Sequence, residues 1–434
     1  MEIRDVIHGT IEVTDAETFV IDSPFFQRLR NIKQLGFGEN SFPGATHNRY
    51  IHSLGALHLA SVAFDNVFSG ADGLIARRPK DAARLRAAVR MAAMLHDVGH
   101  GPLSHTTEFA MPLVERLGLQ KLACVPGRTC AFTEPRQANH EDYTLKIILQ
   151  SSMTDVLKRV FRPFGVEPLH IAAIISDAIY CPEDFFTVDG IDYRPILHQF
   201  VSSEIDVDRM DYLRRDSFHA GVSYGKFDAD WLLSNLSHHL DGGKCYLALK
   251  HRALYTFDDF LISRFHMFLM VYFHHKCVVY DELLGRYFRS SDCDYAIPSD
   301  IEKYIYFDDY HLYTHLARSR NDWAQRVYHK RPYKMLVEFH SGIPLGAENA
   351  AEQKRLRDKA VAELREKGVD FIEKTTTGEL SKYFRAGSAN DGRLPIYVRY
   401  DNGYSPVKFI PLEECTDLFA RYPENRSITR IYVP

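Results

Sequence analysis

Apolar side chains recur every three or four residues along most of the first 325 positions. The period is clear over residues 48–68 and 79–101, where it predicts two amphipathic helices. Residues 23–36 show the same period, with Ser23 as the expected N-cap and Pro24 at the first helical position. Further helical patterns cover 140–150, 153–161, 167–179, 197–220 and 261–288.

The pattern changes after about residue 325, where short apolar runs replace helical periods. These runs predict strands around one charged helix over residues 347–368. Residues 6–13 alternate in the same way and predict a short hairpin strand. We therefore expect a mainly α fold, with a helical body over residues 1–325 and a smaller mixed α/β C-terminal lobe over residues 326–434. The expected strands of the lobe cover 334–342, 369–376, 394–401, 405–412 and 428–434.

The composition narrows the class of protein without naming a function. The chain has 434 residues, of which 45% are hydrophobic, and its formal net charge is −4, so it lacks the basic excess of dedicated nucleic-acid binders. We find no run of 18 apolar residues and no apolar leader, and expect neither secretion nor membrane spanning. The seven scattered cysteines form no CxxC pair, a pattern typical of reduced thiols, so we expect a cytoplasmic protein.

Four residues that are costly to bury stand among apolar neighbours. His52 lies near the start of one predicted helix, His96 and Asp97 lie near the end of the next, and Asp208 lies in a third. An unpaired charge in such surroundings costs roughly several kcal/mol, and a bound divalent cation removes that cost. Two imidazoles and two carboxylates suit Mn, Fe, Co, Ni or Zn, and Mg also stays open. Four ligands on an octahedral ion leave two positions for water and a substrate oxygen.

The same segments resemble the HD-domain metal phosphohydrolases. The likeness is greatest to the deoxynucleoside triphosphate (dNTP) triphosphohydrolases, which include the SAM-and-HD-domain enzymes of animals and their bacterial relatives. The matching stretches are "DVIHGTIEV", "FFQRLRNIKQLGFGENSFPGATHNRYIHSLG", "LHDVGHGPLSH", "NHEDYT" and "IDVDRMDYLRRD", with a weaker match at "SRFHMFLMVYFHHK". The resemblance implies an HD-domain helical body. It also implies that His52, His96, Asp97 and Asp208 together hold one metal ion, and it leaves open a Mg²⁺ ion carried by the nucleotide.

The resemblance implies catalytic roles for His100, His105, His140 and Glu141. In the family the histidines contact phosphates and take part in proton transfer, and a histidine of near-neutral pKa suits either task. Glu141, and also Glu108, would orient these rings. A simpler reading of His100 is a cation at the C-terminus of a helix, where the helix dipole favours it.

Other residues are matched to substrate contacts in the family. Arg49, Arg209 and Arg264 would bind phosphates, although Arg209 replaces a lysine of the animal enzymes and Arg264 also suits a plain ion pair.

The sugar contacts are matched in the same way. Gln34 and Asp216 would bind the 3′-hydroxyl, Leu35 and Tyr272 would crowd the 2′ position, and Tyr212 would stack near the sugar. Leu35 and Tyr272 also suit a plain core position.

A second nucleotide site is implied more weakly. Asp22, Gln27 and Arg30 resemble the residues that bind an activating GTP or dNTP between subunits, which also implies a homo-oligomer, a dimer or a tetramer. A structural ion pair between Asp22 and Arg30 is the alternative.

The function expected from these residues is hydrolysis of a dNTP to a deoxynucleoside and inorganic triphosphate. Two alternatives stay open. One is a phosphodiesterase or nucleotidase of the same fold, which acts on other nucleotides. The other is a nucleotide-responsive binding or regulatory protein in which the metal is structural.

Overall fold

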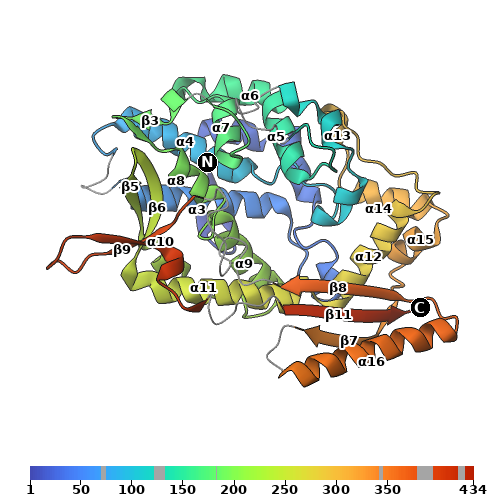
Figure 1. The fold of residues 1–434 in the computed structure, drawn as a ribbon. Coiled ribbons are helices and arrows are strands. Elements are labelled where there is room, and N and C mark those ends of the chain that lie inside the picture. The colour runs from blue at the N-terminus through green and yellow to red at the C-terminus, as the bar shows by residue number, and fades with distance from the viewer. Residues whose placement is uncertain (70–74, 122–131, 182, 342–345, 379–393, 419–425) are drawn as a thin grey trace.

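Helix α3 (Arg49–Phe68) runs through the middle of the helical body (Figure 1). Its N-cap is Asn48, whose side chain accepts the backbone N–H of Ile51. The helix is buried on nearly all sides because α4 (Pro79–Leu95) and α9 (Val207–Ala220) pack against it. These three helices carry the four predicted metal ligands on or next to them.

The computed structural model describes residues 1–69, 75–121, 132–181, 183–341, 346–378, 394–418 and 426–434. Within these ranges, no helix combines the length and the apolar character needed to cross a membrane. Cys181, Cys245, Cys277, Cys293 and Cys415 are free thiols, as expected, whereas Cys124 and Cys130 lie outside the described residues.

The other helices of the body surround α3 and its partners. They are α1 (Asp15–Ile21), α2 (Pro24–Arg28), α5 (His140–Gln150), α6 (Ser152–Phe161), α7 (Pro168–Ile175), α8 (Arg194–Val201), α10 (Ala229–Ser234), α11 (Leu254–Met267), α12 (His275–Arg289), α13 (Ile301–Tyr304), α14 (Asp309–Arg318) and α15 (Asp322–Tyr328).

The described strands form three sheets. The first is the N-terminal hairpin of β1 (Glu2–Asp5) and β2 (Gly9–Glu12). The second has the order β10-β9-β6-β4-β3, with β5 also paired to β6, and the third has the order β7-β11-β8. The remaining strands are β3 (Thr187–Val188), β4 (Ile191–Asp192), β5 (Leu236–Asp241), β6 (Lys244–Lys250), β7 (Lys334–Ser341), β8 (Ile372–Gly378), β9 (Tyr397–Tyr400), β10 (Lys408–Pro411) and β11 (Arg426–Val433).

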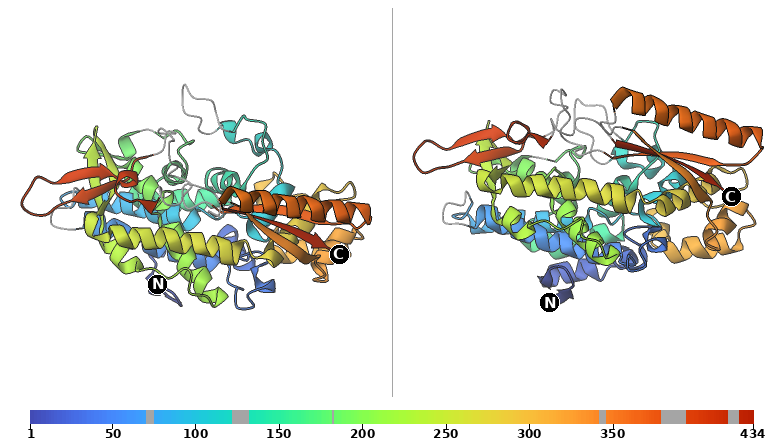
Figure 2. Two further views of the ribbon diagram at one scale, coloured as in Figure 1. Left: turned by 60° about the horizontal axis from the view of Figure 1, so that its bottom comes forward. Right: turned by 90° about the horizontal axis from the view of Figure 1, so that it is seen from below.

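The C-terminal strands are divided between two places in the molecule. β7, β11 and β8 form an antiparallel sheet, and α16 (Gly346–Glu366) covers its outer face through Val361, Phe339 and Ile431 (Figures 1 and 2). β9 instead pairs in parallel with β6 of the body. The division of the chain into domains at residue 325 stays a prediction.

The structure confirms the mainly α fold class, and it differs from the expected elements in a few segments. In the segment 23–36, α2 ends at Arg28, and a 3₁₀ turn and irregular backbone follow. The long pattern over 261–288 is split by a π-helical turn, Phe268–Tyr272, between α11 and α12. The β5–β6 hairpin was not predicted from the sequence.

Candidate active site

The four predicted metal ligands meet where α3, the end of α4 and α9 come together. His52 Nε2 lies 3.0 Å from Asp208 Oδ1 and 3.5 Å from Asp97 Oδ2. His96 Nε2 lies 3.4 Å from Asp208 Oδ1 and 3.4 Å from Asp97 Oδ1. The helices thus bring two imidazoles and two carboxylates around one point.

In their neutral form, both imidazoles present an unprotonated Nε2 to that point. His52 donates its Nδ1–H to Asp211 (2.7 Å), and His96 donates its Nδ1–H to the carbonyl oxygen of Ala93 (2.7 Å). Since a neutral imidazole carries one proton, each Nε2 keeps its lone pair. Both Nε2 atoms are buried and have no hydrogen-bond partner. A cation supplies the missing partner, and the residues present therefore fit a divalent metal ion.

The electrostatics of the cluster favour a positive charge at its centre. Burial lowers the pKa of His52, but the carboxylates of Asp208 and Asp211 outweigh it and raise the pKa to about 10. Burial raises the pKa of Asp208, but His96 and His52 outweigh it and lower the pKa below its ordinary range. A bound metal ion supplies the charge that protons otherwise provide at such a site.

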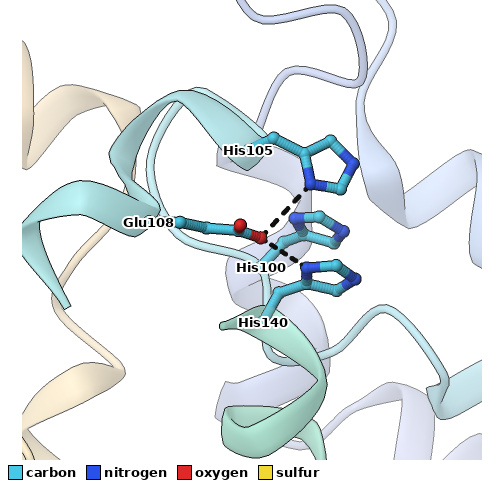
Figure 3. Close-up of side chains that lie close together, drawn as sticks. All are labelled: His100, His105, Glu108 and His140. Carbon is cyan, nitrogen blue, oxygen red and sulfur yellow. Dashed lines mark hydrogen bonds and ion pairs between the residues drawn. The ribbon is translucent and has the colours of Figure 1, made fainter. Parts of the chain in front are cut away.

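A second cluster of three histidines and one glutamate lies beside the first (Figure 3). His140 and His105 both donate an Nδ1–H to Glu108 Oε1, at 2.5 Å and 3.2 Å. The ring of His100 stacks on that of His140 with 3.8 Å between centroids. His100 Nε2 also lies 3.2 Å from Asp97 Oδ1, which connects the two clusters.

The glutamate that orients these rings is Glu108. Burial raises the pKa of Glu108, but the hydrogen bonds from His105 and His140 outweigh it and lower the pKa below its ordinary range. The glutamate is therefore ionised and fixes Nδ1 of both rings as the protonated nitrogen, so that Nε2 is the nitrogen available for proton transfer. Glu141 is exposed in the wall of the same cavity.

The three predicted phosphate-binding arginines line this cavity, and each already contacts an acid. Arg49 donates to Asp97 and, at 2.7 Å, to the hydroxyl of Ser104. Arg209 and Arg264 both face the buried carboxylate of Glu204, at 3.2 Å and 3.8 Å.

The predicted sugar-contacting residues gather at another part of the cavity wall. Asp216 accepts hydrogen bonds from Tyr272 (2.8 Å) and His47 (2.7 Å). The side-chain oxygen of Gln34 is buried without a hydrogen-bond partner. The rings of Tyr212 and Tyr272 lie edge to face, 6.3 Å apart.

Most of these groups line one cavity with a volume of about 860 Å³, whereas His52 and Glu108 lie behind its wall. That volume is in the range of small-molecule sites. The members of the lining that were predicted from the sequence are Gln34, Leu35, Arg49, His96, Asp97, His100, His105, His140, Glu141, Asp208, Arg209, Tyr212, Asp216, Arg264 and Tyr272.

The predicted second nucleotide site lies at α1 and α2, apart from this cavity. Arg30 donates to Gln27 (2.7 Å) and stacks on the ring of Tyr50, 3.6 Å from its centroid. Asp22 is the C-cap of α1. A different cavity of about 750 Å³ has a basic lining that includes Lys250, Arg252, Arg399 and Lys408.

Asp211, which contacts His52 from outside the His-Asp cluster, and the residues around it were not identified from the sequence. Asp211 accepts hydrogen bonds from His52, from His8 (2.6 Å) and from Arg215 (2.8 Å). Arg215 also binds Asp5 of the N-terminal hairpin (2.8 Å). Asp211 stands three positions after Asp208, on the same side of α9, and this spacing was the available signal.

Comparison with known proteins agrees with this geometry. Residues 227–369 match the family model described as the HD associated region. The uncharacterized protein YwfO of Bacillus subtilis is 32% identical over 273 residues, which are 62% of this chain and 51% of YwfO. The human deoxynucleoside triphosphate triphosphohydrolase SAMHD1 is 31% identical over 233 residues, which are 51% of this chain and 33% of SAMHD1. The chain thus spans about half the length of YwfO and a third of SAMHD1.

Two solved structures share the fold over the whole chain. A hypothetical protein from Aquifex aeolicus has a TM-score of 0.68 at 24% identity, and 100% of this chain and 96% of that chain are covered. The phosphohydrolase BT4208 from Bacteroides thetaiotaomicron has a TM-score of 0.66 at 21% identity, with 100% and 99% covered.

The convergent His-Asp cluster and these relatives make the chain similar to the HD-domain phosphohydrolases, as the sequence motifs predicted. The dNTP triphosphohydrolases among these relatives are 26–32% identical to the chain.

Proposed function

We propose that this protein is a metal-dependent dNTP triphosphohydrolase. It converts a dNTP and water to a deoxynucleoside and inorganic triphosphate. One observation carries the proposal: a single cavity is lined by His96, Asp97 and Asp208 of the His-Asp cluster, by three arginines and by the Gln34, Asp216 and Tyr272 group. A phosphohydrolase for monophosphates has no need of three arginines, and a structural metal site has no need of a cavity.

The reaction breaks the bond between the α-phosphorus and the 5′-oxygen. A water oxygen attacks the α-phosphorus, and the 5′-oxygen leaves with a proton, so that atoms and charge balance. His52, His96, Asp97 and Asp208 would hold the divalent cation, which supplies Lewis acidity and lowers the pKa of water. His105 and His140, both oriented by Glu108, supply and accept the protons of the reaction.

The arginines provide the charge that the triphosphate needs. Arg209 and Arg264 stand on the cavity wall with Glu204 behind them, and Arg49 stands beside Asp97. Guanidinium groups suit phosphate oxygens because they donate two parallel hydrogen bonds. The proposed binding order along the chain of phosphates is the α-phosphate near Arg49 and the outer phosphates near Arg209 and Arg264.

Selection of deoxyribose rests on packing at the sugar. Tyr272 is fixed by its hydrogen bond to Asp216, and Leu35 lies in the same wall. A 2′-hydroxyl would crowd these side chains, and such a contact favours the deoxy sugar. The corresponding ribonucleotides are therefore poor substrates.

Regulation by a second nucleotide and assembly into a homo-oligomer belong to the same proposal. The Asp22, Gln27 and Arg30 group and the basic cavity beside Arg252 are two separate places where a nucleotide can act. Arg30→Ala and Arg252→Ala tell them apart, since only the variant at the responsible place loses activation by GTP or a second dNTP. Light scattering with and without nucleotide reports the assembly state. A cytoplasmic location is also part of the proposal.

The test of the activity is a chromatographic analysis of products. Protein loaded with Mn, Fe, Co, Ni, Zn or Mg is incubated with each dNTP, alone and with GTP. We expect equal amounts of deoxynucleoside and triphosphate, and their loss in Asp208→Ala but not in Asp155→Asn, an exposed residue of α6. Release of pyrophosphate or single phosphate instead indicates the nucleotidase alternative. No product with any metal and nucleotide pair would contradict the proposal.

A further inference from the structure

The loop after the His96–Asp97 pair has an unusual backbone. Leu103 and Ser104 both have positive φ, 55° and 61°, and neither residue is glycine. Two consecutive left-handed residues with side chains are strained, and they persist only where the surroundings hold them. The loop leads directly into His105, so whatever holds it also sets the position of that ring.

A second segment of the site lies against this loop. Ser104 donates its hydroxyl to the carbonyl oxygen of Lys33 at 2.7 Å. Gly36 has a φ of +50°, and a Cβ atom there would stand 3.1 Å from the carbonyl oxygen of Leu103. The segment that carries Gln34 and the loop that carries His105 are therefore in close contact.

One carboxylate from a distant part of the chain joins the two segments. Asp309, in the first turn of α14, accepts the backbone N–H of Leu103 at 2.7 Å and the backbone N–H of Lys33 at 3.0 Å. Each carboxylate oxygen takes one of these bonds, and the residue is only 5% exposed. Removal of this side chain leaves the buried N–H of Leu103 and the partly buried N–H of Lys33 without this partner.

We propose that Asp309 is a positioning residue of the active site. By holding the two backbone N–H groups, it fixes the loop that presents His105 and Ser104 relative to the segment that presents Gln34. The consequence for turnover rests on the proposed function, whereas the consequence for the two loops does not.

A further contact supports this role. Tyr304, which precedes α14 along the chain, donates its hydroxyl to the carbonyl oxygen of Gly99 at 2.8 Å. Both Tyr304 and Asp309 belong to residues 227–369, the HD associated region. This region therefore supports the loop between the metal-ligand pair and His105 at both of its ends.

Of the four proposed metal ligands, Asp97 stands at the start of this loop, and the other three lie outside it. His52 and Asp208 lie on α3 and α9, and His96 directly follows α4, so regular helices hold them. A substitution at Asp309 is therefore expected to move the two loops while the metal stays bound.

The experiment compares Asp309→Ala and Asp309→Asn with the wild-type chain by hydrogen exchange and mass spectrometry. We expect peptides that cover residues 31–36 and 97–106 to exchange at least 10-fold faster in Asp309→Ala. The effect should be smaller in Asp309→Asn, whose amide oxygen can still accept one bond. Metal content should stay equal to that of wild type. With dNTP as substrate, kcat should fall about 10- to 100-fold in Asp309→Ala while KM changes less, because misplacement of about 1 Å costs about that much.

The matched control is Asp300→Asn. Asp300 also accepts two backbone N–H groups at the start of a helix, those of Glu302 and Lys303, but it is exposed and touches neither loop. We expect no change in exchange at the two peptides.

Other outcomes overturn the inference. Unchanged exchange in Asp309→Ala would contradict the positioning role. A loss of metal as large as the loss of activity would also contradict it, because Asp309 would then act on the whole fold. If Asp309→Ala does not fold, unchanged exchange in Asp309→Asn is the contradicting result. A wild-type chain without dNTP hydrolysis would refute the proposed function and leave the exchange comparison valid.

Discussion

Asp211 accepts a hydrogen bond from the proposed metal ligand His52, on the ring nitrogen that faces away from the His-Asp cluster. Asp211→Asn keeps the shape of the side chain but removes the charge that holds the Nδ1 proton of His52. We expect metal affinity to fall about 10- to 100-fold, the usual effect of losing an outer carboxylate. A chelator competition titration measures it.

The matched control for that prediction is His8→Ala. His8 bonds the other oxygen of the same carboxylate, so its loss leaves the bond from Asp211 to His52 in place. Metal affinity should fall much less than in Asp211→Asn. An equal fall in both variants would show that Asp211 acts through general stability and not through His52.

Asp309 also makes a prediction about pH. Burial raises the pKa of Asp309 to about 6, with Lys33 opposing the rise and Asp308 adding to it. A raised carboxyl pKa contributes stability that is complete below the unfolded pKa of about 4 and is lost as pH rises through about 6. From pH 4 to pH 7, wild type should therefore lose up to about 3 kcal/mol of unfolding free energy relative to Asp309→Asn.

Urea unfolding at several pH values checks this expectation. Asp300→Asn again serves as the control, because its carboxylate is exposed. A difference between wild type and Asp309→Asn that stays constant with pH would contradict the burial argument.

At the scale of elements, the site depends on how closely α3 and α9 approach each other. A Cβ atom at Gly55 of α3 would stand 1.8 Å from Asp211 Oδ1 and 2.6 Å from the guanidinium of Arg215. Gly55→Ala should therefore separate the helices, cost about 1–3 kcal/mol of stability and weaken metal binding. Thermal melts and metal titration measure both effects.

Gly285 of α12 offers the comparison. A Cβ atom there meets only the end of the Arg289 side chain, at 3.0 Å, and that side chain can move. Gly285→Ala should leave metal binding unchanged, and alanine should stabilise the helix by up to about 1 kcal/mol. Equal destabilisation by both alanines would argue against a special approach at Gly55.

The elements that were predicted well are those whose signals are local. Asn48 and Pro79 mark the starts of α3 and α4, and the apolar periods of these helices continue to their ends. The segment 23–36 also has a helical period, but its backbone leaves the helix after Arg28. Lys33 there bridges to Asn48, and Arg49 donates its N–H to Ile32. Such long-range contacts override the local preference for a helix and give no signal in the neighbouring sequence.

In the candidate site, too, residues with a local signal were predicted and residues placed by long-range contacts were not. The His-Asp pair and the other motif residues stand out along the chain because they are polar among apolar neighbours. The motif favoured Glu141 over Glu108 as the residue that orients the rings. Glu108 stands three positions after His105, but only the fold brings His140 to it. Asp309 could not be found in this way, since its partners are backbone groups more than 200 positions away.

At the scale of the whole molecule, the C-terminal strands β9 and β11 are both attached to the body. β9 pairs with β6, Arg430 donates to the carbonyl oxygen of Phe273, and Tyr432 donates to that of His275. We expect a single cooperative unfolding transition for the full chain in calorimetry. Two separate transitions would show instead that residues after 325 unfold independently.

The pairing of β6 with β9 has a consequence for the order of events during synthesis. Ala248, Leu249 and Lys250 leave the ribosome nearly 150 residues before their partners in β9, Tyr397 to Arg399. At about 5–20 residues per second, this edge waits roughly 7 to 30 seconds for β9. During that time its free backbone groups are a place where chaperones or another nascent chain can bind. The body of the protein therefore completes its sheet only when translation is almost over.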